Sequence, residues 1–439
     1  MSNVLPPPPS PSDAPAPDSR SFSRFQNEVM AGGASDAPGE PEPTAGGSRA
    51  LLGLLMIGAL LALLYSWSPW AFVFVMLLVV CVFLHELGHF MTARWTGMKA
   101  TQFFLFMGPK LWSFRRGETE YGLRLYPVGA FVRIIGMNSM DEVSPEDEPR
   151  AYRNKSYPRR MLVICAGSLM HVLIAVSLLF GVYAVKGQLG PTGEVRIESV
   201  VVGDPAGEAG IKPGDIVRSV DGVAVTSADQ FVSTIQSHQP KDTVAITVLR
   251  DGVEQTIEVG LGSNPNQGPS FGKAYLGTRS GDVNDWQSMS VFEAARSSVT
   301  DLGSNAWATV GGIVKVFNPV NIVRHLTGAT DDLATRPTTV VGISQFSGFV
   351  GGETGLAGIL LLLAGVNVSL GVLNMLPMLP LDGGHAAIAT YERLRSRKGE
   401  EPYHADVAKL IPFAMMTIGL LVTFMLAGLY LDIVNPLGG

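Results

Sequence analysis

Long apolar runs alternate with polar, proline-rich or basic segments along this chain. A helix needs roughly 20 predominantly apolar residues to cross a bilayer. Five runs reach or approach that length, at 51–67, 70–93, 161–185, 355–376 and 410–434. The first run is the shortest, and Ser68 and Pro69 separate it from the second. The pattern predicts an α-helical integral membrane protein with about five transmembrane helices, in two regions at 50–185 and 355–439.

The region between the third and fourth runs has a different pattern. Within 186–262, short β-rich runs such as GEVRIESVVV and VAITVLRDG alternate with turn signals, as in a small α+β domain. Residues 263–354 are richer in Gly and Ser, and FEAARSSVTDLGSNAWATVGGIVKVF has helical spacing. We expect a linker with amphipathic helices on the membrane surface there.

The first 49 residues are rich in Pro, Ser, Ala, Gly and acidic side chains. Such a segment cannot bury enough apolar surface to fold, and it has no early apolar core of a signal peptide. We interpret 1–49 as a disordered tail, with a regulatory docking arm as the alternative.

Composition narrows the class of protein further. Hydrophobic residues make up 46% of the chain and charged residues only 16%, against about 25% in an ordinary soluble domain. This composition argues against a purely soluble enzyme. The net charge is −6, with no basic-aromatic stripe, so nucleic acid is not an expected partner. The two cysteines, Cys81 and Cys165, lie in apolar runs and predict no disulfide framework.

Basic residues near the ends of the runs predict the orientation in the membrane. Lys and Arg gather in 94–160 and again in 385–409, which favours a cytoplasmic location for both segments. Alternation then places the N-terminus in the cytoplasm and 186–354 outside it. We expect a multi-pass protein of the cell's inner (plasma) membrane, with membrane lipid around its helices.

The second apolar run ends in the motif H-E-L-G-H, formed by His85, Glu86 and His89. Residues at i and i+4 share one face of a helix, so two imidazoles there can bind one Zn²⁺ while the Glu reaches a metal-bound water. Ionisable residues in a membrane span are costly and usually functional. The motif predicts a zinc site with Glu86 as the catalytic base. The alternative is a polar cluster solvated at the membrane interface.

A catalytic zinc site takes three protein ligands and keeps one position open. Asp382, in NMLPMLPLDGGH after the fourth run, is the best candidate for the third ligand because both motifs fall at the cytoplasmic ends of their spans. Pro377 and Pro380 interrupt the helix there. Two rivals are His171, in the third run, and His385. A helix-ending turn capped by Asp382 is the alternative without a metal.

The segment YGLRLYPVGAFVRIIG, at 121–136, alternates and carries Gly and Pro breaks. Its pattern predicts a hairpin near the site. An exposed strand edge binds an extended peptide through main-chain hydrogen bonds, which makes Gly129 a candidate substrate-binding residue, together with Pro377. A purely structural hairpin covering the cavity is an equally good interpretation.

These motifs resemble the site-2 proteases, which are intramembrane zinc metalloproteases. HELGH at the end of one span, N-x-x-P…DGG after a later one, and AGIKPGDIVRSVDG in a PDZ-like module at 186–262 carry the resemblance, which covers roughly 70–436. It is strongest to actinobacterial members that cleave anti-sigma factors. The resemblance implies that His85, His89 and Asp382 bind Zn²⁺ and that Asn374 lies near the substrate. His171 stands where the family usually has Asn, and Pro380 comes one position late.

The resemblance implies a zinc metalloendopeptidase that cleaves single-pass membrane proteins within or near their transmembrane segment. The expected substrate is similar to an anti-sigma factor and is first cut outside the cytoplasm by a site-1 protease. Two alternatives remain open at this point. One is a membrane quality-control zinc protease, and the other is a non-catalytic scaffold that binds through its PDZ-like module.

Overall fold

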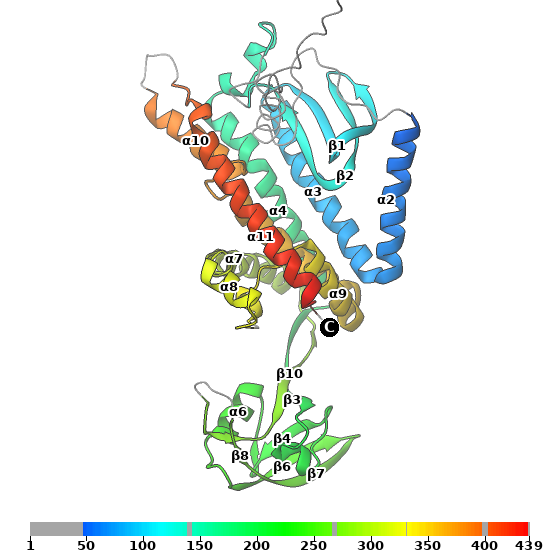
Figure 1. Cartoon of the computed structure of the whole chain (residues 1–439), viewed down its shortest axis with the longest axis vertical. Coiled ribbons are helices and arrows are strands. Elements are labelled where there is room, and N and C mark those ends of the chain that lie inside the picture. The colour runs from blue at the N-terminus through cyan, green and yellow to red at the C-terminus, as the bar shows by residue number, and fades with distance from the viewer. Residues whose placement is uncertain (1–46, 138–142, 266–269, 331, 397–402, 438–439) are drawn as a thin grey trace, which may run out of the picture. The chain divides into compact units, whose positions relative to one another are not determined.

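The computed structural model describes residues 47–137, 143–265, 270–330, 332–396 and 403–437 (Figure 1). The tail expected at 1–49 therefore lies almost wholly outside the described residues. The described chain divides into two compact units. The helical unit runs up to Val182 and resumes at Ala295, and the sheet unit is Tyr183–Ala294.

Five helices of the described residues are long and apolar enough to cross a membrane. They are α2 (Gly47–Trp67), α3 (Pro69–Trp95), α4 (Tyr157–Val185), α9 (Val340–Asn374) and α11 (Ile411–Val434). Helix α9 begins 15 residues before the apolar run expected at 355. Gly355 has a φ of 64° inside it, so two helical segments meet there. The first segment is rich in Gly and Ser and is therefore not recognised as apolar.

A short junction turns the chain from α2 into α3. Ser68 is the N-cap of α3, and its Oγ accepts a hydrogen bond from the Ala71 N–H at 3.2 Å. Pro69 occupies the first position of the helix, where its missing N–H costs nothing. The polar break that separates the two apolar runs is thus a helix cap.

A two-stranded antiparallel sheet follows α3. Its strands are β1 (Ala100–Arg116) and β2 (Thr119–Ile134), and their pairing shifts register several times between Ala100 and Trp112. The sheet lies beside α3 and α2 (Figure 1). The expected hairpin at 121–136 is β2 paired with a strand that the sequence did not predict. The described part of the chain then passes two 3₁₀ turns, Glu148–Arg150 and Tyr152–Asn154, before α4.

A buried aspartate joins the start of α9 to the end of α11. Asp432, near the end of α11, is fully buried, and its Oδ2 accepts hydrogen bonds from the N–H groups of Thr339 and Gly342 at 2.9 and 3.0 Å. Arg336 lies 3.4 Å from its other oxygen. A carboxylate at a helix N-terminus satisfies orphan donors and complements the helix dipole. Asp432 therefore caps α9 from the neighbouring span.

Further helices and 3₁₀ turns lie between these spans. They are α7 (Val291–Val316), α8 (Pro319–Leu326), the 3₁₀ turn Leu333–Thr335, α10 (Asp382–Arg395) and the 3₁₀ turn Val407–Leu410. Helices α7 and α8 fall in the segment where the sequence predicted amphipathic helices. Exposed Trp307 and Phe292 on α7 suit a helix that lies on a membrane surface.

The sheet unit has one main sheet in the order β10-β3-β4-β6-β7, with β5 paired to β4. The strands are β3 (Gln188–Val200), β4 (Ile216–Val220), β5 (Val223–Ala224), β6 (Thr243–Arg250), β7 (Val253–Gly260), β8 (Gly262–Ser263), β9 (Ala274–Tyr275) and β10 (Thr278–Gln287). Two helices, α5 (Pro205–Glu208) and α6 (Ala228–Gln236), complete it. Because β10 pairs with β3, the unit extends past 262, where the sequence pattern placed its end.

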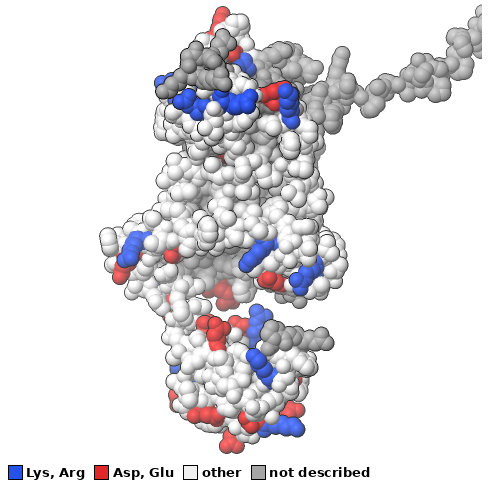
Figure 2. Space-filling view, turned by 90° about the vertical axis from the view of Figure 1, so that its left-hand side faces the viewer, with Lys and Arg blue, Asp and Glu red and all other residues white. Residues whose placement is uncertain are grey.

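The surface of the helical unit is divided by charge. Figure 2 shows a broad band almost without charged side chains over the helical body, with a row of Lys and Arg at the end that carries the β1–β2 sheet and charged side chains of both signs at the other end. Large apolar side chains such as Leu55, Leu63 and Phe413 are about 60% exposed on the spans. An apolar belt of this kind is what a bilayer covers.

Candidate metal centre

The two histidines of HELGH lie on one face of α3, one turn apart. His85 and His89 are 7% and 5% exposed. Helix α4 packs closely against this face, because a Cβ on Gly88 would lie 2.8 Å from the Ala166 carbonyl oxygen. Small residues of this kind let two membrane helices approach each other. The imidazoles therefore point into a space bounded by protein.

Asp382 enters the same space from another element. It is the first residue of α10, after a non-helical turn that begins at Met375. Gly384 allows this turn to fold over the start of α10, since a Cβ there would lie 2.7 Å from the Leu379 nitrogen. The LDGG sequence thus brings the carboxylate to the end of a helix in a tight turn.

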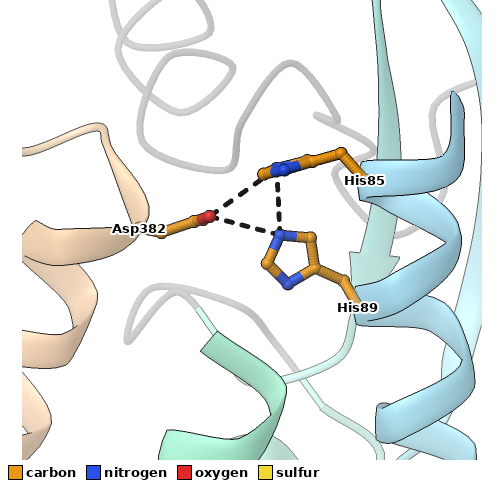
Figure 3. Close-up of side chains that lie close together, drawn as sticks. All are labelled: His85, His89 and Asp382. Atoms are coloured by element: carbon orange, nitrogen blue, oxygen red, sulfur yellow. Dashed lines mark hydrogen bonds and ion pairs between the residues drawn. The ribbon is translucent and has the colours of Figure 1, made fainter. Parts of the chain in front are cut away.

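Three donor atoms converge at this point (Figure 3). Nε2 of His85 and Nε2 of His89 are 3.2 Å apart, and Oδ2 of Asp382 lies 3.6 and 3.3 Å from them. Ligands about 2.0–2.1 Å from a tetrahedral Zn²⁺ lie roughly 3.3 Å from one another. Asp382 Oδ2 is buried with no hydrogen-bond donor among the described residues. The spacing, the donor types and this unsatisfied oxygen all fit a zinc ion.

A second contact orients one of the imidazoles. Nδ1 of His89 lies 2.8 Å from the carbonyl oxygen of Val163 on α4. Since a carbonyl oxygen only accepts hydrogen bonds, Nδ1 carries the proton. The lone pair on Nε2 therefore points to the other two metal-binding atoms, on His85 and Asp382. A backbone partner of this kind is usual behind a histidine that binds a metal. Nδ1 of His85 has no such partner among the described residues.

Glu86 lies beside the three donors without belonging to them. Its Oε1 is 3.9 Å from Nε2 of His85, and its side chain is 17% exposed. On its other side the carboxylate faces the backbone of Val132 in β2. A carboxylate beside a set of metal-binding side chains can act as the general base for a water bound to the metal.

The structure separates the other residues that the sequence singled out. Asn374 is the last residue of α9 and is half-buried, and Gly129 lies in β2 with a φ of 69°. Pro377 is exposed and lines a cavity of about 630 Å³ between α10 and α11. None of these three hydrogen-bonds to the donor cluster in the residues that the structure describes. Their roles remain predictions.

The rival ligands also lie nearby. The His171 ring is 4.8 Å from the His85 ring, centroid to centroid, but His171 does not belong to the cluster of mutually close donor atoms. His385 lies on α10, three residues after Asp382. Of the described residues, only His85, His89 and Asp382 form such a cluster.

Sequence reasoning missed Asn367, a fully buried residue in the middle of α9. It hydrogen-bonds to His171. An amide in an apolar run costs free energy unless it has partners, so its presence in GVNVSL was the available signal.

Comparisons with known proteins agree with this geometry. The sequence profile of "Peptidase family M50" matches residues 73–419. The chain is 32% identical over 402 residues to "Zinc metalloprotease Rip1" of Mycobacterium tuberculosis, covering 83% of this chain and 97% of the relative. Identity to the protein of the same name in Mycolicibacterium smegmatis is 31% over 400 residues, with the same coverage.

A solved structure resembles part of the chain. It is the PDZ domain of an SdrC-like protein from Listeria monocytogenes, at 25% sequence identity and a TM-score of 0.17. The match covers 19% of this chain and 83% of that domain.

Proposed function

The chain belongs to peptidase family M50, the site-2 zinc metalloproteases, and from this premise we propose that it cleaves single-pass membrane proteins within or beside their transmembrane segment. The observation that carries the proposal is the convergence of His85, His89 and Asp382 next to Glu86. The three side chains fit a zinc ion, and the Glu86 carboxylate lies beside them in a helix that can span a membrane. This arrangement suits hydrolysis of a peptide bond at membrane depth.

The three ligands and Glu86 divide the chemistry between them. Bound zinc would polarise the scissile carbonyl and lower the pKa of water. Glu86 takes the proton of the attacking water on its carboxylate and passes it to the leaving amine nitrogen. The two neutral imidazoles and the one carboxylate leave the zinc site with a single positive charge, which is less costly near an apolar medium than two.

The substrate must lose its helical hydrogen bonds before its peptide bonds can react. The backbone of β2 near Val132 faces Glu86, so an unwound segment paired to this sheet would pass close to the donor cluster. Gly129, Asn374 and Pro377 are the residues proposed to contact it. Asn374 supplies an amide that satisfies backbone groups of an opened strand.

The orientation and the biological output are parts of the same proposal. From the basic segments we propose that the β1–β2 sheet and α10 lie in the cytoplasm and the sheet unit outside it. We propose that the sheet unit is PDZ-like and either binds the new C-terminus left by a first protease or excludes uncut substrates. The released product would be a cytoplasmic regulator, such as an anti-sigma domain with its sigma factor.

The test compares membrane proteomes of a strain lacking the protease, complemented either with the native chain or with Glu86→Gln. In the strain with Glu86→Gln, the substrates should accumulate as membrane-bound stubs. In the strain with the native protease, these stubs should be absent. Identical stub populations in the two strains would contradict the proposal. Reporters fused after Gly399 and near Gly268 should score as cytoplasmic and extracytoplasmic, respectively.

The sheet unit is tested separately by deleting residues 194–262. A size filter predicts that the deletion allows cleavage of an unshortened substrate. A delivery role predicts that cleavage of a shortened substrate stops. Unchanged cleavage of both forms would remove the unit from the mechanism.

A further inference from the structure

Beyond the three ligands and Glu86, a third imidazole lies at the site. His171, on α4, is 2% exposed, and its ring contacts that of His85 at a centroid distance of 4.8 Å and an angle of 37°. Helix α9 packs against α4 here, since a Cβ on Gly371 would lie 3.3 Å from Cβ of His171. The histidine is thus held between two spans.

Asn367 determines which nitrogen of His171 carries the proton. Its Nδ2 donates to the Leu363 carbonyl oxygen at 2.8 Å and to Sγ of Cys81 at 3.3 Å. Both amide hydrogens are therefore used, and Oδ1 is the atom that faces Nδ1 of His171 at 2.8 Å. Because this oxygen only accepts, Nδ1 must be the donor, and the Nε2 of the neutral ring keeps its lone pair.

Nothing in the described residues donates to that lone pair. Nε2 makes no hydrogen bond with the described residues. It is not fully buried, so a ligand in the site can reach it. Nor is His171 one of the mutually close metal-binding atoms. The Nε2 lone pair is thus accessible at the site and free to accept a hydrogen bond from a donor that arrives with the substrate.

We propose that His171 is a further substrate-contacting residue, whose Nε2 accepts a hydrogen bond from a backbone N–H of the unwound substrate beside the metal ligands. A helix that unwinds exposes N–H groups that have lost their carbonyl partners. The Asn367 side chain fixes the imidazole in the tautomer that can accept one of them. This inference rests on the proposed function, because it presupposes a peptide at the donor cluster.

The experiment measures binding without turnover, in zinc-loaded Glu86→Gln protein in detergent. The probe is a fluorescent peptide of about 20 apolar residues with Gly-Ser-Gly at its centre. Adding His171→Phe keeps a ring of similar shape but removes the lone pair, and should weaken peptide binding about tenfold, the loss of roughly one good hydrogen bond. Asn367→Leu should also weaken peptide binding, because it removes the oxygen that keeps the proton of His171 on Nδ1.

The matched control is His325→Phe on α8. His325 is also a buried histidine, 7% exposed, but its Nε2 is already paired with Thr335 Oγ1 at 3.0 Å. Peptide binding should not change in this variant. Zinc content, measured in every variant, should stay at one equivalent.

The outcomes separate this inference from the proposed function. Unchanged peptide binding in His171→Phe, or loss of zinc in that variant, overturns the assignment, since the first denies the contact and the second makes His171 a support for the ligands. A native chain that cleaves no membrane protein refutes the proposed function itself. A peptide that Glu86→Gln does not bind at all counts against both.

Discussion

Gly167 on α4 leaves no room for a methyl group beside His85. A Cβ at this position would lie 2.7 Å from Nε2 of His85 and would also collide with the ring of His89. The α3 imidazoles can therefore converge on Asp382 only because the facing helix has no side chain there. The proposed metal centre thus depends on a glycine that is not itself a candidate ligand.

Gly167→Ala should lower zinc affinity at least tenfold, because one imidazole must move to make room for the methyl group. An alanine is otherwise favoured over glycine in a helix by about 1 kcal/mol, so the helix itself should not suffer. Competition with a chelator measures the affinity. Gly181→Ala is the control, since a Cβ at this site on the same helix meets nothing within 4 Å. Equal zinc affinity in the two variants would contradict the close contact.

Asp382→Ala should weaken zinc binding by more than a hundredfold and abolish cleavage, because it removes the ligand that lowers the charge of the site. His171→Asn should keep its zinc, since His171 lies outside the donor cluster. Zinc content after dialysis against a chelator checks both. Normal zinc in Asp382→Ala together with loss in His171→Asn would reverse the assignment of the third ligand.

Much of this arrangement follows from local sequence, and part of it does not. The apolar runs, the break at Ser68 and Pro69, and the spacing of HELGH are local features. Helix α3 begins one residue before the expected run at 70–93 and ends two residues after it. The proximity of His85, His89 and Asp382 could be argued because both motifs end spans on the same side.

Contacts between residues far apart in the sequence could not be predicted from local patterns. The strand β10 joins β3 across the whole sheet unit, and Asn367 meets His171 across 196 residues. Neither contact leaves a periodic signal in the sequence. The bend at Gly355 likewise joins two helices that a hydropathy pattern treats separately.

Glu392→Ala should destabilise the helical unit and loosen α10, the helix that carries Asp382. Glu392, on α10, pairs with Arg160 of α4 at 2.6 Å, and their side chains are only 8% and 11% exposed. Removing one partner of a buried pair typically costs about 3–5 kcal/mol. Thermal unfolding in detergent, followed by circular dichroism, should show a clear fall in Tm.

The control for this pair is Asp406→Ala. Asp406 and Lys409 form an exposed pair at 3.4 Å, and such pairs contribute about 1 kcal/mol or less. A Tm for Glu392→Ala as high as that of Asp406→Ala would show that the link between α4 and α10 is not stabilising.

The sheet unit should lose stability in acid through Asp215. Burial raises the pKa of this carboxyl, but hydrogen bonds from Arg250 and the Lys212 N–H outweigh burial, so the pKa is lowered overall. A lowered folded pKa gives stability that is complete above the ordinary value near 4 and is lost as pH falls through the folded value. Asp215→Asn should therefore be less stable at pH 7 and show a weaker dependence on acid.

Limited proteolysis of the full chain, scored by cuts within Tyr183–Ala294, measures this stability as a function of pH. Glu198→Gln is the control, because Glu198 and its partner Arg279 are 50% and 82% exposed. An acid dependence in Asp215→Asn equal to that of the native chain would exclude Asp215 as its source.

Glu86→Gln tests the central claim most directly. Glutamine has nearly the same shape as glutamate but cannot take a proton from water at neutral pH, and Glu86 is not one of the three candidate ligands. The measurement pairs zinc content with cleavage of a membrane-embedded substrate by the same purified protein. The account predicts one equivalent of zinc and a loss of cleavage of at least a thousandfold, consistent with removal of a general base. Cleavage at a rate near that of the native chain, with zinc bound, would contradict it.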